Sequence, residues 1–302
     1  MPGYTLRQLE CFTAVADHGS IHAAATALFA SESAVSAAVT ALEEAMGAQL
    51  LVRRKAHGAA LTPSGRYVAD HARALLAQAG DLQLHAADAA AVLRGRVSVG
   101  CYGTLAPTLL SALVDGFVRR HPDVEVDFVH GDQPSILEAV ESGRADLAIA
   151  YDLSLGSQLQ RLPLYTAHAN VVLSPEHPLA AQERLGLREL AEHPMIMLDV
   201  APSRDNTMRM FAAAGLVPRV RFRTTDFEVT RSLVGRGLGW SVLIQAPAGN
   251  LSYEGKPLRV RPLDEDAAGV PVSLVWSAQR RLSQAAQAMA ALARELFGGP
   301  PA

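Results

Sequence analysis

The opening part of the chain carries apolar residues at helical spacing, separated by polar positions. Repeats every three or four residues are typical of amphipathic helices, and two such helices are expected here before residue 30. Ser20 can accept a hydrogen bond from the free amides at the start of the second one and is its expected cap. The apolar faces are Leu6, Leu9, Phe12, Val15 and Ala16 in the first helix, and Ile21, Ala24, Ala25 and Leu28 in the second.

The helical pattern restarts at Ser31 or Ser33 and ends at Gly47, a residue suited to a helix terminus. This third helix is amphipathic. Its expected inward positions are Ala34, Val35, Ala38, Val39, Leu42 and Met46, and its expected outward positions are Glu32, Ser33, Ser36, Ala37, Thr40 and Ala41. Small outward side chains let a helix lie deep in a DNA major groove, which is about 12 Å wide.

A cationic hairpin is expected directly after this helix. Leu50 and Leu51 precede Arg53, Arg54 and Lys55, whose charges can straddle phosphates. His57 is expected to be a neighbour of the same phosphates. A helix, a two-helix hairpin and a basic wing together predict a winged helix-turn-helix. The alternative is an alanine-rich helical hairpin packed in an ordinary core.

Residues 6–68, LRQLECFTAVADHGSIHAAATALFASESAVSAAVTALEEAMGAQLLVRRKAHGAALTPSGRYV, resemble the N-terminal domain of LysR-type transcriptional regulators. The LRQLECF opening, the GS before the alanine-rich helix, the ALEEAMGAQLLVRR run and the LTPSG motif carry the resemblance. Two departures weaken direct base readout: Glu32 stands where glutamine is frequent, and Ala37 and Ala38 stand where polar residues are. The expected DNA-binding residues are Ser31, Ser33, Ser36, Ala37, Thr40, Arg53, Arg54, Lys55 and His57.

The first 66 residues carry as many acidic as basic side chains. A single copy is therefore expected to bind DNA weakly. Two copies on one duplex raise the effective concentration, so binding should depend on self-association and should fall steeply with salt.

The long run from Pro63 to about Leu93 contains no internal proline and predicts one helix. Val68, Leu75, Leu82 and Ala89 repeat every seven residues, which favours packing against a second copy. The alternative is packing on the chain's own domains. The family resemblance implies dimerisation through this helix and common assembly as homodimers or homotetramers. The expected divisions are a DNA-binding domain at 1–65, a linker helix at 66–94 and an effector domain at 95–302.

From residue 96 onward, strand patterns alternate with helix patterns, which predicts an α/β domain with an open parallel sheet. The strand PVSLVWSA and the last helix are expected to return to the first block, with crossings near residues 162–168 and 262–269. Two lobes result, the first at about 95–163 and 268–302 and the second at about 164–267. This arrangement, and the phrases VEVDFVHGDQPSILEAVESGRADLAIAY and RSLVGRGLGWSVL, resemble the two-lobed, periplasmic-binding-protein-like effector domain of the same family. Its expected helices cover residues 107–120, 134–143, 187–192, 204–214, 226–235 and 283–297.

Ligands of such domains settle at the carboxyl ends of strands, which nominates residues for an effector site. Helix-start amides and Arg204 favour a small organic acid. The alternative is that the polar nominees are only caps and turn formers. Asp132 and Asp152 would repel an anion unless turned away, so a ligand with an amine or hydroxyl stays open as well. The nominated residues are Tyr102, Gly103, Thr104, Asp132, Gln133, Tyr151, Pro202, Ser203, Arg204 and Thr225.

Composition narrows the remaining classes. The chain has 302 residues, 49% of them apolar, and a net charge of −3, with no run long enough for a bilayer and no export signal, so a cytoplasmic protein without membrane contact is expected. Cys11 and Cys101 give no disulfide framework, although a redox role for Cys101 stays open. No catalytic motif, metal-ligand spacing or cofactor motif is present, so neither an enzyme nor a cofactor is expected.

These observations predict a sequence-specific transcriptional regulator controlled by a small-molecule effector. Its expected partners are double-stranded promoter DNA, the effector and further copies of itself, with RNA polymerase left open. A nonspecific DNA-organising protein and a solute-binding protein are the alternatives.

Overall fold

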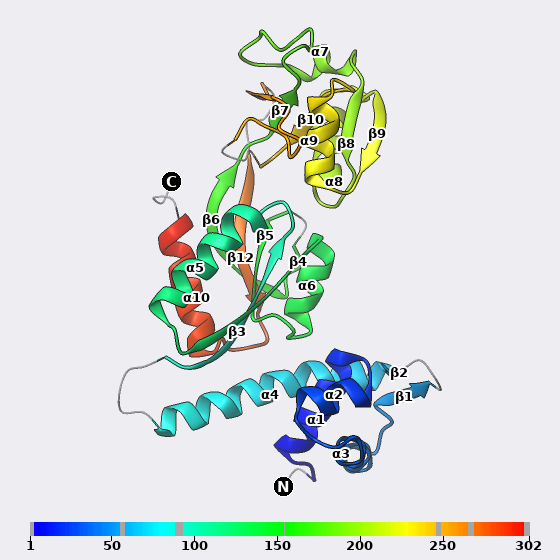
Figure 1. The fold of residues 1–302 in the computed structure, drawn as a ribbon, viewed down its shortest axis with the longest axis vertical. Coiled ribbons are helices and arrows are strands. Elements are labelled where there is room, and N and C mark those ends of the chain that lie inside the picture. Colours follow the sequence, from blue (N-terminus) through cyan, green and yellow to red (C-terminus); the bar gives the residue numbers. More distant parts are fainter. Residues whose placement is uncertain are drawn as a thin grey trace.

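The computed structural model describes residues 3–54, 58–87, 93–153, 155–245, 249–264 and 269–298. Figure 1 shows a small helical unit at the N-terminal end, a long helix α4 beside it, and a two-lobed α/β body in which lobe II lies beyond lobe I. The expected fold class is confirmed.

The N-terminal unit contains α1 (Leu6–His18), α2 (Ile21–Ala27) and α3 (Glu32–Met46), followed by the hairpin β1 (Leu51–Arg54) and β2 (Gly58–Leu61). Local side chains fix the helix starts: Ser20 accepts from the amide of Ala23, and Ser31 from that of Ala34. The expected cap at Ser20 and the end at Gly47, which is left-handed with φ 62°, are both confirmed. The expected inward position of Ala34 is wrong, because this first-turn residue is exposed.

Helix α4 (Pro63–Ala87) starts as expected, but its end differs. Residues 88–92 lie outside the described residues, and Leu93, the expected last helical residue, is not helical. One face of α4 completes the core of the N-terminal unit, since Ala69 and Ala72 are buried with Leu9, Phe12 and other residues of α1 to α3.

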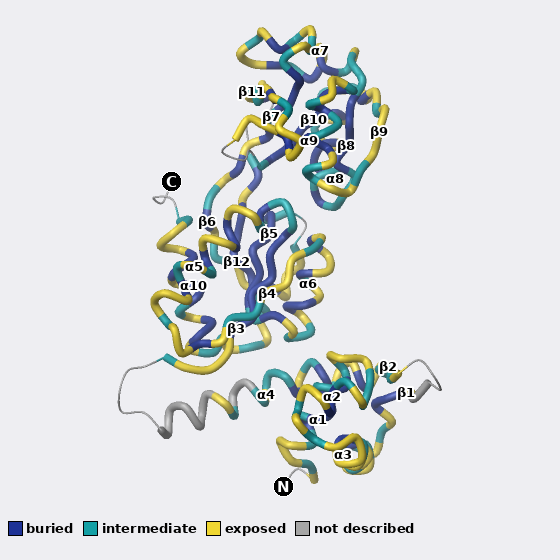
Figure 2. The backbone as a smooth tube through the Cα atoms, viewed as in Figure 1, coloured by how far each residue is buried: buried dark blue, intermediate teal, exposed yellow. Residues whose placement is uncertain are grey.

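Lobe I is built on a five-stranded sheet in the order β4-β3-β5-β12-β6. Its strands are β3 (Gly95–Tyr102), β4 (Val124–Gly131), β5 (Leu147–Tyr151), β6 (Leu159–Ala167) and β12 (Val270–Ser277). β3 pairs in parallel with β4 and β5, whereas β12 is antiparallel to β5 and β6. The all-parallel expectation is therefore wrong: β12 enters from lobe II, opposite to the other strands. Figure 2 shows β3, β5 and β12 as the most buried part of this lobe.

Helices cover both faces of this sheet, with α5 (Ser111–Arg120) and α10 (Gln284–Phe297) on one face and α6 (Gln133–Glu141) on the other (Figure 1). The single helix expected over residues 107–120 is instead a π-helical turn, η1 (Ala106–Leu110), followed by α5. Pro107 lies in the first turn, where its missing amide hydrogen costs no helical hydrogen bond, so the segment stays helical from Ala106 onward.

Lobe II contains the antiparallel sheet β10-β7-β11 and the parallel pair of β8 and β9. The bounds of its strands are β7 (Asn170–Leu173), β8 (Met195–Leu198), β9 (Val220–Thr224), β10 (Ser241–Leu243) and β11 (Arg259–Pro262). The helices are α7 (Leu187–Ala191), α8 (Ser203–Ala213) and α9 (Phe227–Gly235). The sequence pattern places strands near 170–173, 194–198, 220–224 and 239–244, so all of these elements but β11 were expected, with ends within two residues of those observed.

Strands β6 and β12 link the lobes and pair with each other along their whole lengths, with a register shift at Val272 and Ser273. The stretch expected as a mere crossing, residues 162–168, is therefore largely strand. Part of the second crossing, residues 265–268, lies outside the described residues.

Among the described residues, no single helix has the length and apolar character needed to cross a bilayer. The bent pair α2 and α3 passes that test only when the two are taken together. The apolar side chains of this pair line the N-terminal core.

Candidate nucleic-acid interface and effector cleft

Helix α3 has one buried and one exposed face. Val35, Val39 and Leu42 are fully buried, and they anchor α3 on α1 and α2. On the opposite side Ser33, Ala37 and Thr40 are exposed and Ser36 is half-buried. Between Ser33 and Thr40 this face carries short side chains, with the exposed Glu32 and Glu44 at its two ends, and so allows a close approach to a flat or grooved partner.

The turn between α2 and α3 sets the angle of this helix. The two axes are bent by 109°, within the range of helix-turn-helix motifs. Phe29 in the turn is left-handed, with φ 50°, and its side chain is 99% exposed. Ser31 is an expected DNA contact. Its Oγ accepts a hydrogen bond from the amide of Ala34 and lies 3.0 Å from Ser33 Oγ. Its first role is therefore to start α3.

The hairpin is held against the helices by backbone bonds. Glu43 on α3 accepts from the amides of Leu50 and Leu51 at 2.7 and 3.0 Å. The amide of Ala59 in β2 donates to Gly19 O at 2.7 Å. Gly58 lies so close to the same carbonyl that a Cβ would be 2.4 Å from it. A carboxylate and a glycine thus fix the wing relative to α3.

The expected cations belong to this wing. Arg53 and Arg54 are the last residues of β1 and pair with Ala59 and Gly58 of β2. Lys55 and His57 lie outside the described residues.

The LTPSG motif joins the wing to α4. Thr62 Oγ1 donates to Gln49 O at 2.8 Å and accepts from the amide of Gly65 at 2.9 Å, which starts α4. A Cβ on Gly65 would lie 2.0 Å from Leu50 O, so only glycine fits here.

The expected dimerisation seam is divided between two environments. Val68 packs against the core of its own N-terminal unit, whereas Leu75 is 42% exposed. Tyr67, stacked on His71 with ring centroids 4.1 Å apart, is 66% exposed. The side chain of Leu82 and the whole of Ala89 lie outside the described residues. The exposed face of α4 is therefore defined by Tyr67, His71 and Leu75.

Between the lobes, the structure brings three of the nominated effector residues together. Tyr102, at the end of β3 in lobe I, shares a hydrogen bond of 3.0 Å with Ser203 Oγ at the start of α8 in lobe II. The ring of Tyr151, at the end of β5, lies edge-on to Tyr102 with centroids 5.4 Å apart. Burial raises the pKa of both phenols, so both keep their protons and act as neutral hydrogen-bonding groups.

Several other nominees are committed to structural roles. Asp132 caps α6 by accepting from the amide of Ser135, and these bonds lower the pKa of its carboxyl. Gln133 is buried, accepts from the amide of Tyr151 at 3.0 Å and donates to Leu153 O at 3.3 Å. Asp132 therefore follows the alternative of caps and turn formers, whereas Gln133 ties the start of α6 to the end of β5.

Arg204 is already paired. Its Nε donates to Asp205 at 2.8 Å and its Nη1 to Asp199 at 3.3 Å. Gly103 donates its amide to Gly131 O at 2.8 Å. Thr104, two residues after the end of β3, is half-buried, and Pro202, the residue before α8, is buried. Thr225, between β9 and α9, is exposed.

Sequence reasoning missed two residues near these tyrosines. Gln245 Nε2 donates to Tyr165 Oη at 2.9 Å. Both residues also act on the pKa of the Tyr151 phenol: a hydrogen bond with Gln245 lowers it, and Tyr165 raises it. Gln245 follows β10, so the rule that ligands settle at strand ends could have found it. Tyr165 lies in a segment expected to be a crossing rather than a strand, and no local signal marked it.

The cysteine beside the cleft is shielded. Cys101 is fully buried, and burial alone raises the pKa of its thiol to about 12. A thiol of this kind reacts slowly with oxidants, because the thiolate is the nucleophile. Among the residues that the structure describes, no three His, Cys, Asp or Glu side chains gather into a metal site.

Comparisons with known proteins agree with this architecture. Residues 6–66 match the family described as bacterial regulatory helix-turn-helix protein, lysR family, and residues 90–298 match the LysR substrate binding domain. The chain is 30% identical to the HTH-type transcriptional regulator CysB of Burkholderia cenocepacia over 76% of this chain and 74% of that protein.

Solved structures are similar as well. HinK, a LysR family transcriptional regulator from Pseudomonas aeruginosa, is 32% identical, with a TM-score of 0.66, over 97% of this chain and 99% of that one. The C-terminal domain of a probable LysR family regulator from Rhodococcus is 40% identical, with a TM-score of 0.65, over 67% of this chain and 99% of that one. The chain therefore belongs to the LysR family and is a DNA-binding transcriptional regulator with an effector-binding domain.

Proposed function

We propose that α3 inserts its face of short side chains into the major groove of promoter DNA while the wing holds the adjacent phosphates. The single observation that carries this proposal is the exposed, short-side-chain face of α3, set at 109° to α2 beside the wing. Ser33, Ser36, Ala37 and Thr40 approach the bases, and Arg53, Arg54, Lys55 and His57 approach the backbone. Ser31 acts mainly by starting α3.

A binding competition tests this proposal. The full chain should prefer a fragment from the DNA upstream of its own gene over a shuffled fragment of equal length at moderate ionic strength. Equal affinity for both fragments would favour the alternative of a nonspecific DNA-organising protein. Ser36→Ala and Thr40→Ala should change the consensus selected from random oligonucleotides. Ser111→Ala, a change at an exposed serine of α5 in lobe I, should not.

Oligomers of this regulator are proposed to form through α4. The exposed residues Tyr67, His71 and Leu75 lie four residues apart, on one side of the helix. Ala69 and Ala72 face the chain's own core and take no part. The proposed seam keeps Leu75 of the expected set and leaves out Val68, which packs against the core of its own N-terminal unit. RNA polymerase as a further partner stays a prediction.

The effector is proposed to be a small organic acid held between the lobes. The start of α8 supports this, because its N-cap residue, Pro202, offers no side-chain acceptor to the helix amides. Helices α6 and α9, in contrast, are capped by Asp132 and Asp226. Free amides at a helix start favour an anionic oxygen. Arg204 is not needed as the carboxylate partner, since Asp199 and Asp205 occupy it.

A thermal-shift screen tests the ligand class. Small carboxylic acids should raise the unfolding temperature, and their methyl esters and amides should not. A ligand at a hundred times its Kd stabilises the folded state by about 2.7 kcal/mol. Stabilisation by the neutral analogues alone would contradict the proposal. The proposal assigns no catalytic step to this chain, consistent with relatives that are transcriptional regulators.

A further inference from the structure

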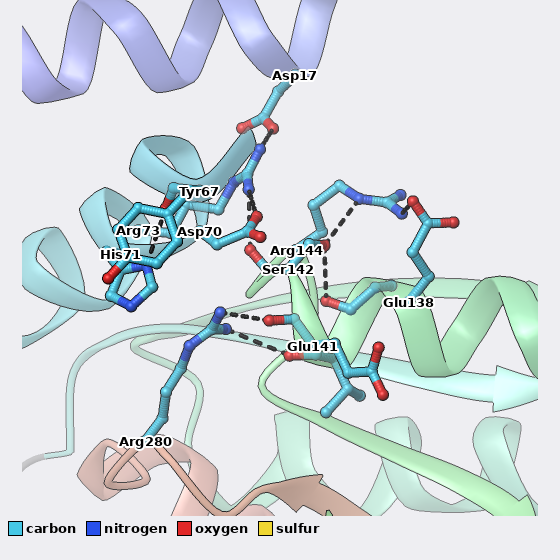
Figure 3. A network of polar contacts seen from close by, with 12 residues as sticks. Asp17, Tyr67, Asp70, His71, Arg73, Glu138, Glu141, Ser142, Arg144 and Arg280 are labelled. Carbon is cyan, nitrogen blue, oxygen red and sulfur yellow. Dashed lines mark hydrogen bonds and ion pairs between the residues drawn. The ribbon is translucent and has the colours of Figure 1, made fainter. Parts of the chain in front are cut away.

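Arg73 on α4 contacts three parts of the chain at one point (Figure 3). Its Nη2 donates to Asp17 Oδ1 on α1 at 2.5 Å. Its Nη1 donates to Ser142 O, just after α6 in lobe I, at 2.9 Å and to Asp70 Oδ1 at 3.1 Å. One guanidinium therefore ties the N-terminal unit, the linker helix and lobe I together.

This contact is sheltered but not fully satisfied. The Arg73 side chain is only 13% exposed, so its ion pairs are less screened than surface pairs. Its Nε is buried and donates to no atom of the described residues. A buried donor without an acceptor raises the free energy of the state in which Arg73 joins the N-terminal unit to lobe I. Such a contact can break more easily than a fully hydrogen-bonded one.

The lobe I side of this contact is the carboxyl end of α6. Arg280, which precedes α10, donates to Val140 O at 3.3 Å and to Glu141 O at 2.6 Å. Arg73 takes the next carbonyl, that of Ser142. The negative end of a helix favours cations, so the end of α6 receives one arginine from within lobe I and another from α4.

The other end of α6 lies at the effector cleft. Gln133, its first residue, bonds the backbone of Tyr151 and Leu153, and Tyr151 packs on Tyr102. Helix α6 has nine residues and spans roughly 13 Å at 1.5 Å per residue. A rigid element therefore joins the aromatic cleft to the Arg73 contact.

We propose that Arg73 is a latch that holds the N-terminal unit against lobe I of the same chain, and that α6 carries movement from the cleft to this latch. The regulatory part rests on the proposed function. The latch itself does not, because it is a contact within one chain.

Distances between spin labels test the latch in the full chain. Ala45→Cys on α3 and Ala112→Cys on α5 place labels at exposed positions on the two sides, and both native cysteines are buried. Dilution with unlabelled protein restricts the signal to pairs within one chain. The expected result is a narrow distance distribution that broadens and lengthens in Arg73→Ala.

Arg120→Ala is the matched control, because it removes a lobe I arginine that pairs with Glu295 on α10 rather than with a residue of the latch. It should leave the distribution narrow. Arg280 does not serve as a control, because its charge acts on both Asp70 and Arg73. Asp17→Asn changes only the α1 side of the latch and should broaden the distribution even where Arg73→Ala folds poorly. An unchanged distribution in both Arg73→Ala and Asp17→Asn overturns the latch.

Gln133→Ala tests the role of α6. It should broaden the distribution in the parent chain and add nothing in the Arg73→Ala background, since coupled sites are not additive. No broadening in the parent chain overturns the role of α6.

DNA binding separates this proposal from the proposed function. Arg73→Ala should change the affinity for the chain's own upstream fragment by roughly fivefold or more, and Arg120→Ala should not. Altered distances with unaltered affinity overturn the regulatory part. If the parent chain itself shows no preference for that fragment, the proposed function fails, while the distances still decide the latch.

Discussion

The hydrogen bond between Tyr102 and Ser203 connects the two lobes directly, and removing it should loosen the cleft. Tyr102→Phe deletes the phenol oxygen and keeps the ring that packs on Tyr151. A hydrogen bond of this kind contributes about 0.5–1.5 kcal/mol net. That range corresponds to a change of roughly 2- to 13-fold in the balance between joined and separated lobes.

A double-mutant cycle isolates this bond. Tyr102→Phe and Ser203→Ala should each lower the free energy of unfolding, and the pair should cost less than their sum by about 1 kcal/mol. Chemical denaturation can be followed by tryptophan fluorescence, because Trp240 lies in lobe II and Trp276 in lobe I.

An exposed tyrosine provides the control. Tyr253 is 89% exposed, so Tyr253→Phe should change the stability by less than about 0.5 kcal/mol. A coupling energy within about 0.3 kcal/mol of zero between Tyr102 and Ser203 would refute the reasoning. The lobes would then be held by packing alone.

Three further predictions concern other parts of the chain. Leu42→Ala removes a fully buried side chain from α3 and should cost about 2–5 kcal/mol in denaturation, with loss of DNA binding; a smaller loss would mean that the site collapses around the change. Arg53→Ala with Arg54→Ala should weaken binding to all sequences and lower the salt slope by about 0.9 for each lost phosphate contact, and an unchanged gel-shift affinity would count against the wing. Burial raises the pKa of the Cys101 thiol from 9.0 to about 12, so at pH 8 it should form roughly a thousandfold less thiolate than an ordinary thiol. Rapid labelling of Cys101 in the native protein by a disulfide reagent would contradict this burial argument.

The sequence predicted best those features that depend on neighbouring residues. Ser20 caps α2 and Gly47 ends α3 as expected, because a helix start or end needs only side chains and backbone within one turn. The position of β9 was also predicted, since its alternating pattern needs no partner to be recognised.

What sequence reasoning missed depends on distant contacts. The antiparallel direction of β12 follows from the path of the chain through lobe II, which no local pattern encodes. Arg204 was nominated to bind a ligand, yet it pairs with its neighbour Asp205 and with Asp199 five residues earlier, a role that was already open to local reasoning. Tyr165 joins the cleft only because β6 is a strand. The position of a polar residue at a strand end therefore predicts that it lies near the cleft, but it does not predict what its side chain binds.

The two strands that bridge the lobes also decide how the effector domain can deform. Because β6 and β12 are bonded edge to edge from Leu159 to Ala167, they form a strip that resists shearing in its own plane and yields most easily perpendicular to it. The bulge at Val272 and Ser273 adds local twist and a point of weakness. We therefore expect the lobes to move relative to each other mainly about one axis, whatever the chemistry of the ligand.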